Sequence, residues 1–362
     1  MSIVINGPVN TQTSYGITVS NLINSLSNNG ENVYTVPIGG MNWFSVQENI
    51  PKSLKNGESI TRELRKKGKS VRIFHQFALM EHVCDYHIGF PIFELDTFTE
   101  QEIANLKVCD ELIVCSKWAE QVILDNGITD INISVVPLGV DGDIFSPENL
   151  IEEVDEKEKP FTFFFPGKFE YRKGFDIVME VFDKAFPTEN VNIIFLPLNP
   201  MLNQEETTEW VNSLVASNLA KRGCVQISGR VDTPHEVANI VRYSDAVVSF
   251  SRAEGWNLPL LEALSCGRSV IATNYSGHTE FLNNENSTLV EVGQKEDAYD
   301  GKVFVGQGQW LSYTDSNIDD FVEALRLVYK NGRKYNVKGI ETASQFSWKN
   351  SALKLASIVK EN

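Results

Sequence analysis

The chain has 362 residues, of which 42% are hydrophobic and 22% charged, and a formal net charge of −16. This length suits two domains better than one core, and the acidic balance disfavours bulk binding of polyanions such as nucleic acid. No apolar run approaches the roughly 20 residues that span a bilayer. The opening MSIVINGP lacks the basic and apolar regions of a signal peptide, so we expect a cytoplasmic protein.

The first stretch predicts a strand at Ile3–Ile5, a helix over Gly16–Leu26 and a second strand at Asn32–Pro37. Gly16 stands at the helix start, where a residue without a side chain lets the backbone approach a phosphate. No GxGxxG fingerprint follows the first strand, which disfavours a dinucleotide-dependent dehydrogenase.

A basic run, RELRKKGKSVR at Arg62–Arg72, could serve an anionic acceptor or a membrane surface. A solvated helix end explains it more simply, because charge runs are usually exposed faces. His75 follows the predicted strand Val71–Phe74, at the edge where open α/β sheets bind ligands. His82 and His87 show no zinc-like spacing, so we interpret them as structural.

A strand is predicted at Glu111–Cys115, with a helix from the N-cap Ser116, and the last strand of the first half at Val135–Val136. Ile151–Lys159 (IEEVDEKEK) is acidic and reads as a linker between two domains. Asp141–Gly142–Asp143 has the letters of a metal-binding DxD motif, but we interpret it as a loop at the domain edge.

A second α/β repeat opens with the strand Phe161–Phe165 and the loop PGKFEYRK, followed by a predicted helix from Gly174. Lys168 and Lys173 bracket this loop, and Arg172 lies beside Lys173. Cations near a helix start oppose the helix dipole, so a bound anion would explain them.

The most informative stretch is Ser251–Gly267, which reads SRAEGWNLPLLEALSCG and follows the apolar run Asp245–Phe250. It predicts a turn and a helix from Leu258, with Asn257 as the N-cap. Such a strand-to-helix turn aims backbone N–H groups into a cleft and forms an anion site. Glu254 and Glu262 flank this mouth, where they would accept hydrogen bonds from sugar and ribose hydroxyls.

EGWNLPLLEALSCG resembles the EGFGLPLLEAMACG signature of retaining GT-B glycosyltransferases of family 4. It keeps the two glutamates eight positions apart but has Trp256–Asn257 where Phe-Gly is usual. The loop from Lys168 to Lys173 resembles the family's G-R-x-x-x-x-K-G pattern, with Lys168 in place of the arginine. SVVPLGVDGDIF at Ser134–Phe145 resembles the stretch that closes the family's N-terminal domain.

The resemblance implies an α/β fold of the GT-B type, with two Rossmann-like domains whose parallel sheets face each other across a cleft. Residues 1–150 would form an acceptor domain, and residues 160–345 a donor domain for the nucleotide sugar. A final helix, at about 346–362, would pack back on the first domain.

The implied activity is that of a hexosyl- or pentosyltransferase, which moves a sugar from a nucleotide-diphosphate sugar to a hydroxyl with retention and without metal or other cofactor. The resemblance gives catalytic roles to Lys168, Lys173, Glu254 and His75. It gives donor contacts to Gly16, Arg172, Arg230, Gly255, Trp256, Asn257, Leu258 and Glu262, and a further possible contact to Glu280.

Two other functions remain open on the same scaffold, a nucleotide-sugar epimerase and a non-catalytic protein that binds a nucleotide or a carbohydrate. The sequence names neither the sugar nor the base. A glycan, lipid, protein, small molecule or modified nucleic acid could be the acceptor.

Overall fold

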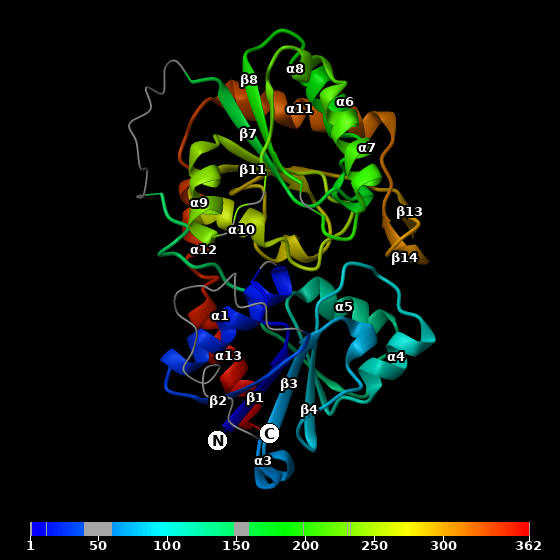
Figure 1. Cartoon of the computed structure of the whole chain (residues 1–362), viewed down its shortest axis with the longest axis vertical. Coiled ribbons are helices and arrows are strands. Elements are labelled where there is room, and N and C mark those ends of the chain that lie inside the picture. The colour runs from blue at the N-terminus through cyan, green and yellow to red at the C-terminus, as the bar shows by residue number, and fades with distance from the viewer. Residues whose placement is uncertain are drawn as a thin grey trace. The chain divides into compact units, whose positions relative to one another are not determined.

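The computed structural model describes residues 2–11, 13–39, 60–147, 159–197, 199–229, 231 and 233–361. The chain forms two compact units, Met1–Asp141 with Gln345–Asn362, and Gly142–Ser344 (Figure 1). The division falls at Asp141, a few residues before the boundary at 150 that the sequence suggested. Most of the predicted linker, residues 151–158, lies outside the described residues.

In its described part, the first unit holds a six-stranded parallel sheet of order β2-β1-β3-β4-β5-β6. The strands are β1 (Ser2–Gly7), β2 (Asn32–Pro37), β3 (Lys69–Phe74), β4 (Tyr86–Pro91), β5 (Glu111–Val114) and β6 (Asn132–Val135). The helices are α1 (Ser14–Asn28), α3 (Arg62–Lys67), α4 (Glu100–Lys107), α5 (Lys117–Asp125) and α13 (Trp348–Glu361), with a 3₁₀ turn η2 (Gln76–Ala78).

Local sequence chemistry explains where these elements begin. Ile3, Val4 and Ile5 are fully buried in β1, as expected for a central parallel strand covered on both faces. The Ser116 hydroxyl accepts a hydrogen bond from the Ala119 N–H and caps α5, as the sequence predicted. Thr99 and Glu102 form a reciprocal capping box that begins α4.

Strand β4 was not predicted from the sequence. Its residues, YHIGFP, include a histidine, a glycine and a proline, which weaken any strand pattern. The strand forms because it pairs with β3 along its whole length and with β5 on its other side, so tertiary pairing outweighs the weak local preference.

In its described part, the second unit holds another six-stranded parallel sheet, of order β12-β11-β10-β7-β8-β9. Its strands are β7 (Phe161–Pro166), β8 (Val191–Leu196), β9 (Val225–Ile227), β10 (Ala246–Ser249), β11 (Ser269–Thr273) and β12 (Thr288–Val290). Its helices are α6 (Val178–Ala185), α7 (Gln204–Val215), α8 (Asn218–Lys221), α9 (Pro234–Tyr243), α10 (Leu258–Ser265), α11 (Asp315–Asn331) and α12 (Val337–Ala343), with 3₁₀ turns η3 (Tyr171–Lys173) and η4 (Gly277–Glu280).

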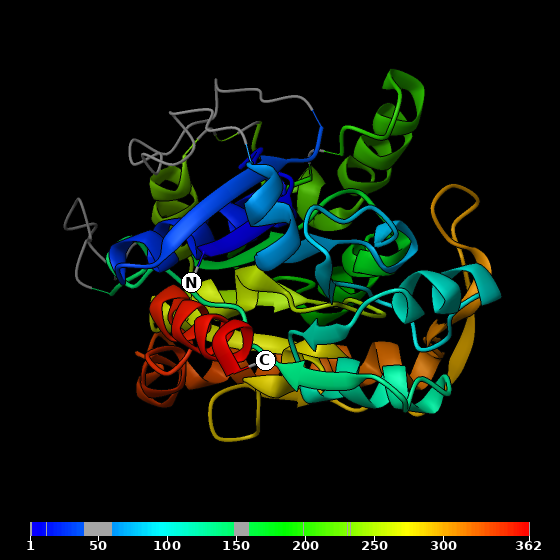
Figure 2. The ribbon, with the colours of Figure 1, turned by 90° about the horizontal axis from the view of Figure 1, so that it is seen from below.

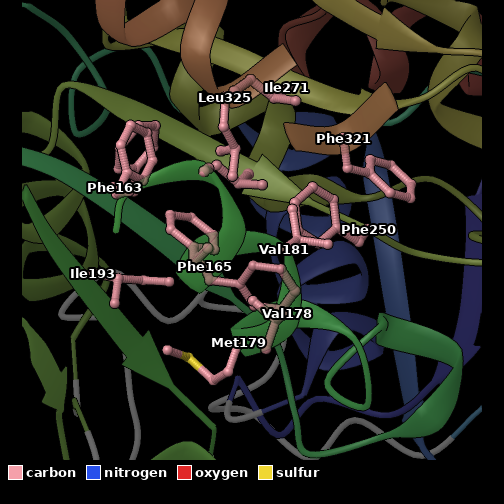
Figure 3. Packing of buried hydrophobic residues seen from close by; sticks show 14 of the residues in the cluster. Phe163, Phe165, Val178, Met179, Val181, Ile193, Phe250, Ile271, Phe321 and Leu325 are labelled. Atoms are coloured by element: carbon pink, nitrogen blue, oxygen red, sulfur yellow. The ribbon is translucent and has the colours of Figure 1, made fainter. Parts of the chain in front are cut away.

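The core of the second unit is rich in phenylalanine (Figure 3). Phe165 of β7 meets Phe250 edge to face, with ring centroids 5.6 Å apart. Phe250 in turn packs on Phe321 of α11 at 4.4 Å. These large rings bury much apolar surface at the strand ends, so the loops that follow β7 and β10 start from a rigid base.

Helix α13 belongs to the first unit, although residues 142–344 separate it from the rest of that unit. It packs against α1 and is coloured red in Figures 1 and 2. The Ser351 hydroxyl donates a hydrogen bond of 2.6 Å to the Pro137 carbonyl, and Lys360 pairs with Glu31 of the loop after α1. The predicted packing of this helix on the first half of the chain is therefore present.

An antiparallel hairpin of β13 (Lys295–Tyr299) and β14 (Val305–Leu311) extends the second unit and was not predicted. Its buried Trp310 packs on Tyr171, at 5.8 Å between ring centroids, and on Phe304 at 5.1 Å. The hairpin thus supports η3 from outside the main sheet.

Each unit is an α/β domain with a parallel sheet, so the prediction of two Rossmann-like domains is confirmed. In the part of the chain that the structure describes, no helix combines the length and apolar character needed to cross a bilayer.

Candidate active site

The order of the second sheet reverses between β7 and β10, and open α/β sheets bind ligands at such a switch point. The loops that follow these two strands are in direct contact. The Arg172 guanidinium donates a hydrogen bond of 2.7 Å to the Ala253 carbonyl, and the Arg252 N–H donates to the Arg172 carbonyl at the same distance. The loop after Phe165 and the loop before Leu258 therefore lie against each other.

Gly174 makes this contact possible. Its φ is +80°, and a Cβ at this position would lie 2.4 Å from the Phe250 carbonyl oxygen. Only glycine fits, because it has no side chain and adopts positive φ at little cost.

The helix predicted from Gly174 in fact begins at Val178, after η3 and a left-handed glycine. The argument that a helix dipole requires an anion near Lys173 therefore has no basis in the structure. Carboxylates of the protein balance these cations instead.

Glu254 is buried, and three side chains donate to its carboxylate. Lys173 Nζ lies 2.5 Å from Oε1, the Ser251 hydroxyl 2.6 Å from Oε1, and Arg172 3.1 Å from Oε2. Burial by itself would raise the pKa of Glu254, but Lys173 and Arg172 outweigh it and lower that pKa to about 2. Glu254 is therefore a charged acceptor at neutral pH with a fixed orientation.

Arg172 has a different role from the predicted contact with a diphosphate. Its side chain is buried and bonds Ala253, Glu254 and Glu170. Arg172 therefore links the loop after β7 to the loop after β10. Lys173 is also enclosed, and burial lowers its pKa while the nearby Glu254 opposes that change.

Lys168 is the more accessible of the two predicted lysines, with 44% of its side chain exposed. It forms an ion pair of 3.0 Å with Glu170, which also pairs with Arg172 at 2.9 Å. Burial would raise the pKa of Glu170, but Arg172 and Lys168 outweigh it and lower the value. Sequence reasoning missed Glu170, although its place between two cations of the same loop was a usable signal.

Asn257 occupies the N-cap position of α10, as the sequence predicted, but its side chain makes no capping hydrogen bond. Its backbone is left-handed, with φ 73° and ψ 65°, and its amide donates to the Ser249 hydroxyl at 3.1 Å. Asparagine tolerates this conformation better than other side chains, which explains how it can replace the usual glycine. Helix α10 begins immediately afterwards at the buried Leu258.

Trp256 points its indole into the core, where it packs on Phe281 at 5.0 Å. A donor contact from this residue is therefore limited to its backbone. Gly255 lies against η4, because a Cβ on Gly277 would come within 2.0 Å of the Gly255 carbonyl oxygen. The Ser276 hydroxyl accepts a bond of 2.8 Å from the Glu254 N–H and fixes the same turn.

Glu262 lies about one turn into α10 and is partly buried. Burial raises its pKa to about 7. In contrast to Glu254, this carboxyl group exchanges its proton near neutral pH, so it can donate or accept a hydrogen bond.

In the first unit the strand order reverses between β1 and β3. Gly16 follows β1, and a Cβ on it would lie 1.8 Å from the Asn10 carbonyl oxygen. This close packing accounts for the glycine, and its phosphate contact stays a prediction. His75 follows β3, with Nδ1 3.0 Å from the Tyr15 hydroxyl and its ring stacked on Phe77 at 5.0 Å.

The structure treats Arg230, Glu280 and the basic run at Arg62–Arg72 differently. Arg230 lies outside the described residues, and Glu280 lies in η4. The basic patch is shorter than predicted, because Arg72 is buried, and its guanidinium bonds Asn6, Ala78 and Glu81. Within the described ranges, no group of three or more His, Cys, Asp or Glu side chains could hold a metal ion.

Comparison with known proteins places this geometry in context. Residues 147–303 match the family model described as Glycosyl transferases group 1. An uncharacterized glycosyltransferase of Methanocaldococcus jannaschii is 25% identical over 239 residues, which cover 64% of this chain and 57% of that protein. The chain spans about half the length of the curated relatives it matches.

Solved structures share the fold over the whole chain. A glycosyltransferase from Rickettsia africae superposes with a TM-score of 0.73 at 18% identity and covers 99% of this chain and 98% of its own. The Anabaena protein HepE, in complex with UDP-glucose, superposes with a TM-score of 0.70 at 13% identity. The alignment covers 100% of this chain and 100% of that one. Likeness at this level of identity establishes a common fold.

Proposed function

We propose that this chain is a group 1 glycosyltransferase that transfers a sugar from a nucleotide-diphosphate sugar to a hydroxyl group of an acceptor, because residues 147–303 match the group 1 model and the chain shares its fold with solved glycosyltransferases. One observation carries the proposal. The loops after β7 and β10 meet around a fixed carboxylate, Glu254, beside an accessible cation and the amide end of α10.

The leaving diphosphate gains negative charge as its bond to the sugar breaks. Lys168 is exposed enough to turn from Glu170 to this phosphate. At the start of α10 the backbone donor would be the Leu258 N–H, because Pro259 has no N–H and the Leu260 N–H donates to the Asn257 carbonyl. Positive groups close to the leaving phosphate oxygen stabilise its developing negative charge. They support a reaction that needs no metal ion.

The two glutamates suit neutral parts of the donor. Glu254 accepts hydrogen bonds from sugar hydroxyls, since Lys173 and Arg172 keep it ionised and immobile. Glu262 would form hydrogen bonds with the ribose hydroxyls. Its carboxyl group would accept such a bond when ionised and could donate one when protonated. The nucleobase is proposed as uracil, because the HepE neighbour was solved with UDP-glucose.

The proposed reaction retains the configuration at the anomeric carbon. The bond from this carbon to the phosphate oxygen breaks, and a bond to the acceptor oxygen forms on the same face of the sugar. The acceptor proton passes to the leaving phosphate oxygen, so atoms and charge balance without an enzymatic nucleophile.

The test begins with native mass spectrometry of the chain against UDP-, GDP- and ADP-sugars, followed by transfer assays with a panel of hydroxyl acceptors. We expect Lys168→Gln to lower kcat/KM roughly 10- to 100-fold, the size of one lost charge contact to the transition state. Lys168→Arg should keep or raise activity, because guanidinium binds phosphate with two parallel bonds.

The matched control is Lys184→Gln on α6. Lys184 is 46% exposed and also paired with a glutamate, but it lies away from both loops. It should leave turnover unchanged. Conversion of the donor sugar without an acceptor would identify an epimerase, and binding without any turnover a non-catalytic protein. If the chain binds none of the nucleotide sugars, the proposal is refuted.

A further inference from the structure

The imidazole of His75 is partly buried and contacts three aromatic rings within the first unit. Phe77 stacks on it with an angle of 9° between the rings, while Tyr15 and Phe74 meet it edge-on at 4.6 and 5.1 Å. This packing fixes the plane of the ring, and therefore the directions in which its two nitrogens point.

The loop that carries Phe77 is itself anchored. Arg72 of β3 donates a hydrogen bond of 2.6 Å to the Ala78 carbonyl, and His87 Nε2 lies 2.8 Å from the Leu79 carbonyl oxygen. Arg72 and His87 are both buried, so the backbone that directly follows Phe77 is fixed.

The hydroxyl of Tyr15 decides which nitrogen of His75 bears a hydrogen. It lies 2.6 Å from the Ile92 carbonyl oxygen and 3.0 Å from His75 Nδ1. A carbonyl oxygen can only accept, so the single phenolic hydrogen is directed to Ile92. The remaining contact is a hydrogen bond only if Nδ1 donates its own hydrogen to the phenolic oxygen.

We propose that Tyr15 is a positioning residue that keeps the hydrogen of His75 on Nδ1, so that Nε2 is the nitrogen that accepts a hydrogen bond or takes up a proton. The partner of a histidine's first nitrogen sets the chemistry of the second.

Tyr15 is well suited to this role. Burial, with smaller contributions from Glu94 and Cys115, raises its pKa well above the usual value, so the phenol stays neutral and keeps its hydrogen. Its place in the first turn of α1 is also fixed, since Thr13 caps the helix by accepting from the Gly16 N–H at 3.1 Å.

The consequence for transfer rests on the proposed function. If His75 meets the reacting sugar, its Nε2 would accept a hydrogen bond from a sugar hydroxyl. With the opposite tautomer, Nε2–H would instead donate to the oxygen of the sugar hydroxyl. The hydrogen of that hydroxyl would then need another acceptor. Tyr15 would thereby select the orientation of a hydroxyl that it does not touch.

The direct test is ¹⁵N NMR of the full chain with labelled histidine, recorded at pH 8. The chain has five histidines, and His75→Gln assigns the signal of interest. We expect the pattern of a ring protonated on Nδ1 in the wild type. Tyr15→Phe should move the signal towards the tautomer protonated on Nε2, while Tyr299→Phe, a change on the exposed hairpin, should leave it in place.

The kinetic test uses UDP-glucose and the acceptor found above. Tyr15→Phe should lower kcat roughly 3- to 10-fold, the effect of one neutral hydrogen bond. In a His75→Gln background the same change should have no further effect, because Tyr15 acts through His75. A residue with a purely structural role would lower activity in both backgrounds.

Two results would overturn the inference. One is an Nε2–H signal in the wild type, which requires no variant to fold. The other is an unchanged His75 signal in a folded Tyr15→Phe protein. Because the NMR test needs no substrate, a failure of the glycosyltransferase proposal leaves this result readable by itself.

Discussion

Glu254 and Glu262 lie in the same strand–turn–helix segment, yet their carboxyl groups ionise in opposite ways. Lys173 and Arg172 overcome burial at Glu254 and lower its pKa to about 2. At Glu262, burial acts without a compensating cation and raises the pKa to about 7. The difference follows from the partners that tertiary folding brings to each residue.

Glu262 should make the folded state less stable as the pH rises. Its folded pKa of about 7 exceeds the reference value of 4.5, so the native protein binds more protons than the unfolded chain between these values. The unfolding free energy should therefore fall across this window, by on the order of 2–3 kcal/mol. Glu262→Gln should remove this decrease, as measured by urea unfolding from pH 5 to pH 8.

Glu209→Gln provides the control, because Glu209 is an exposed glutamate in the middle of α7. Its unfolding curves should follow those of the wild type at every pH. An unfolding free energy for Glu262→Gln that runs parallel to the wild type from pH 5 to pH 8 would contradict the prediction.

Sequence patterns singled out Lys173, Glu254 and Glu262 as candidate residues but could not give their mutual contacts. The structure places Lys173 and Glu254 in direct contact and Glu262 in α10. The ion pair from Arg172 to Glu254 joins residues far apart in the chain, and no local pattern contains such a contact. The left-handed backbone of Asn257 was missed for a related reason, since asparagine is also a frequent N-cap.

At the scale of elements, sequence reasoning succeeded where apolar residues were concentrated. Strand β2 matches its predicted bounds, because most of its residues are β-branched or aromatic. It failed for β4, with its glycine and proline, and for the hairpin of β13 and β14, whose KEDAY and VGQGQWL segments are polar. Those elements depend on pairing and on packing through Trp310 rather than on local preference.

Helix α13 should contribute strongly to the first unit through its buried face. Leu355 is 0% exposed, so Leu355→Ala would leave a cavity and should lower stability by about 2–5 kcal/mol. Since α13 packs on α1, hydrogen exchange should increase in α1 and leave α10 unchanged. Mass spectrometry of deuterium uptake measures both helices in one experiment.

Leu353 on the same helix supplies the matched control, because 48% of it is exposed. Leu353→Ala should change stability by less than about 0.5 kcal/mol. Similar losses in the two variants, or faster exchange in α10 than in α1, would show that α13 does not stabilise the first unit in this way.

For the whole molecule, the dominant electrostatic feature is an excess of acidic residues, 48 against 32 lysines and arginines. Repulsion among these charges opposes the compact state, and salt screens it over about 10 Å at 0.1 M. Raising NaCl from 20 to 300 mM should therefore increase Tm by about 2–4 °C, equivalent to about 1 kcal/mol. A Tm that stays constant or falls in calorimetry over this range would contradict the prediction.

The return of the chain to its first unit also sets an order of events during synthesis. Residues 142–344 leave the ribosome before α13, so the apolar face of α1 that α13 covers has no partner while they are made. At 5–20 residues per second, this interval lasts about 10–40 s. During that time the first unit is incomplete while the second is being made. We therefore expect chaperones to bind the uncovered apolar face of α1.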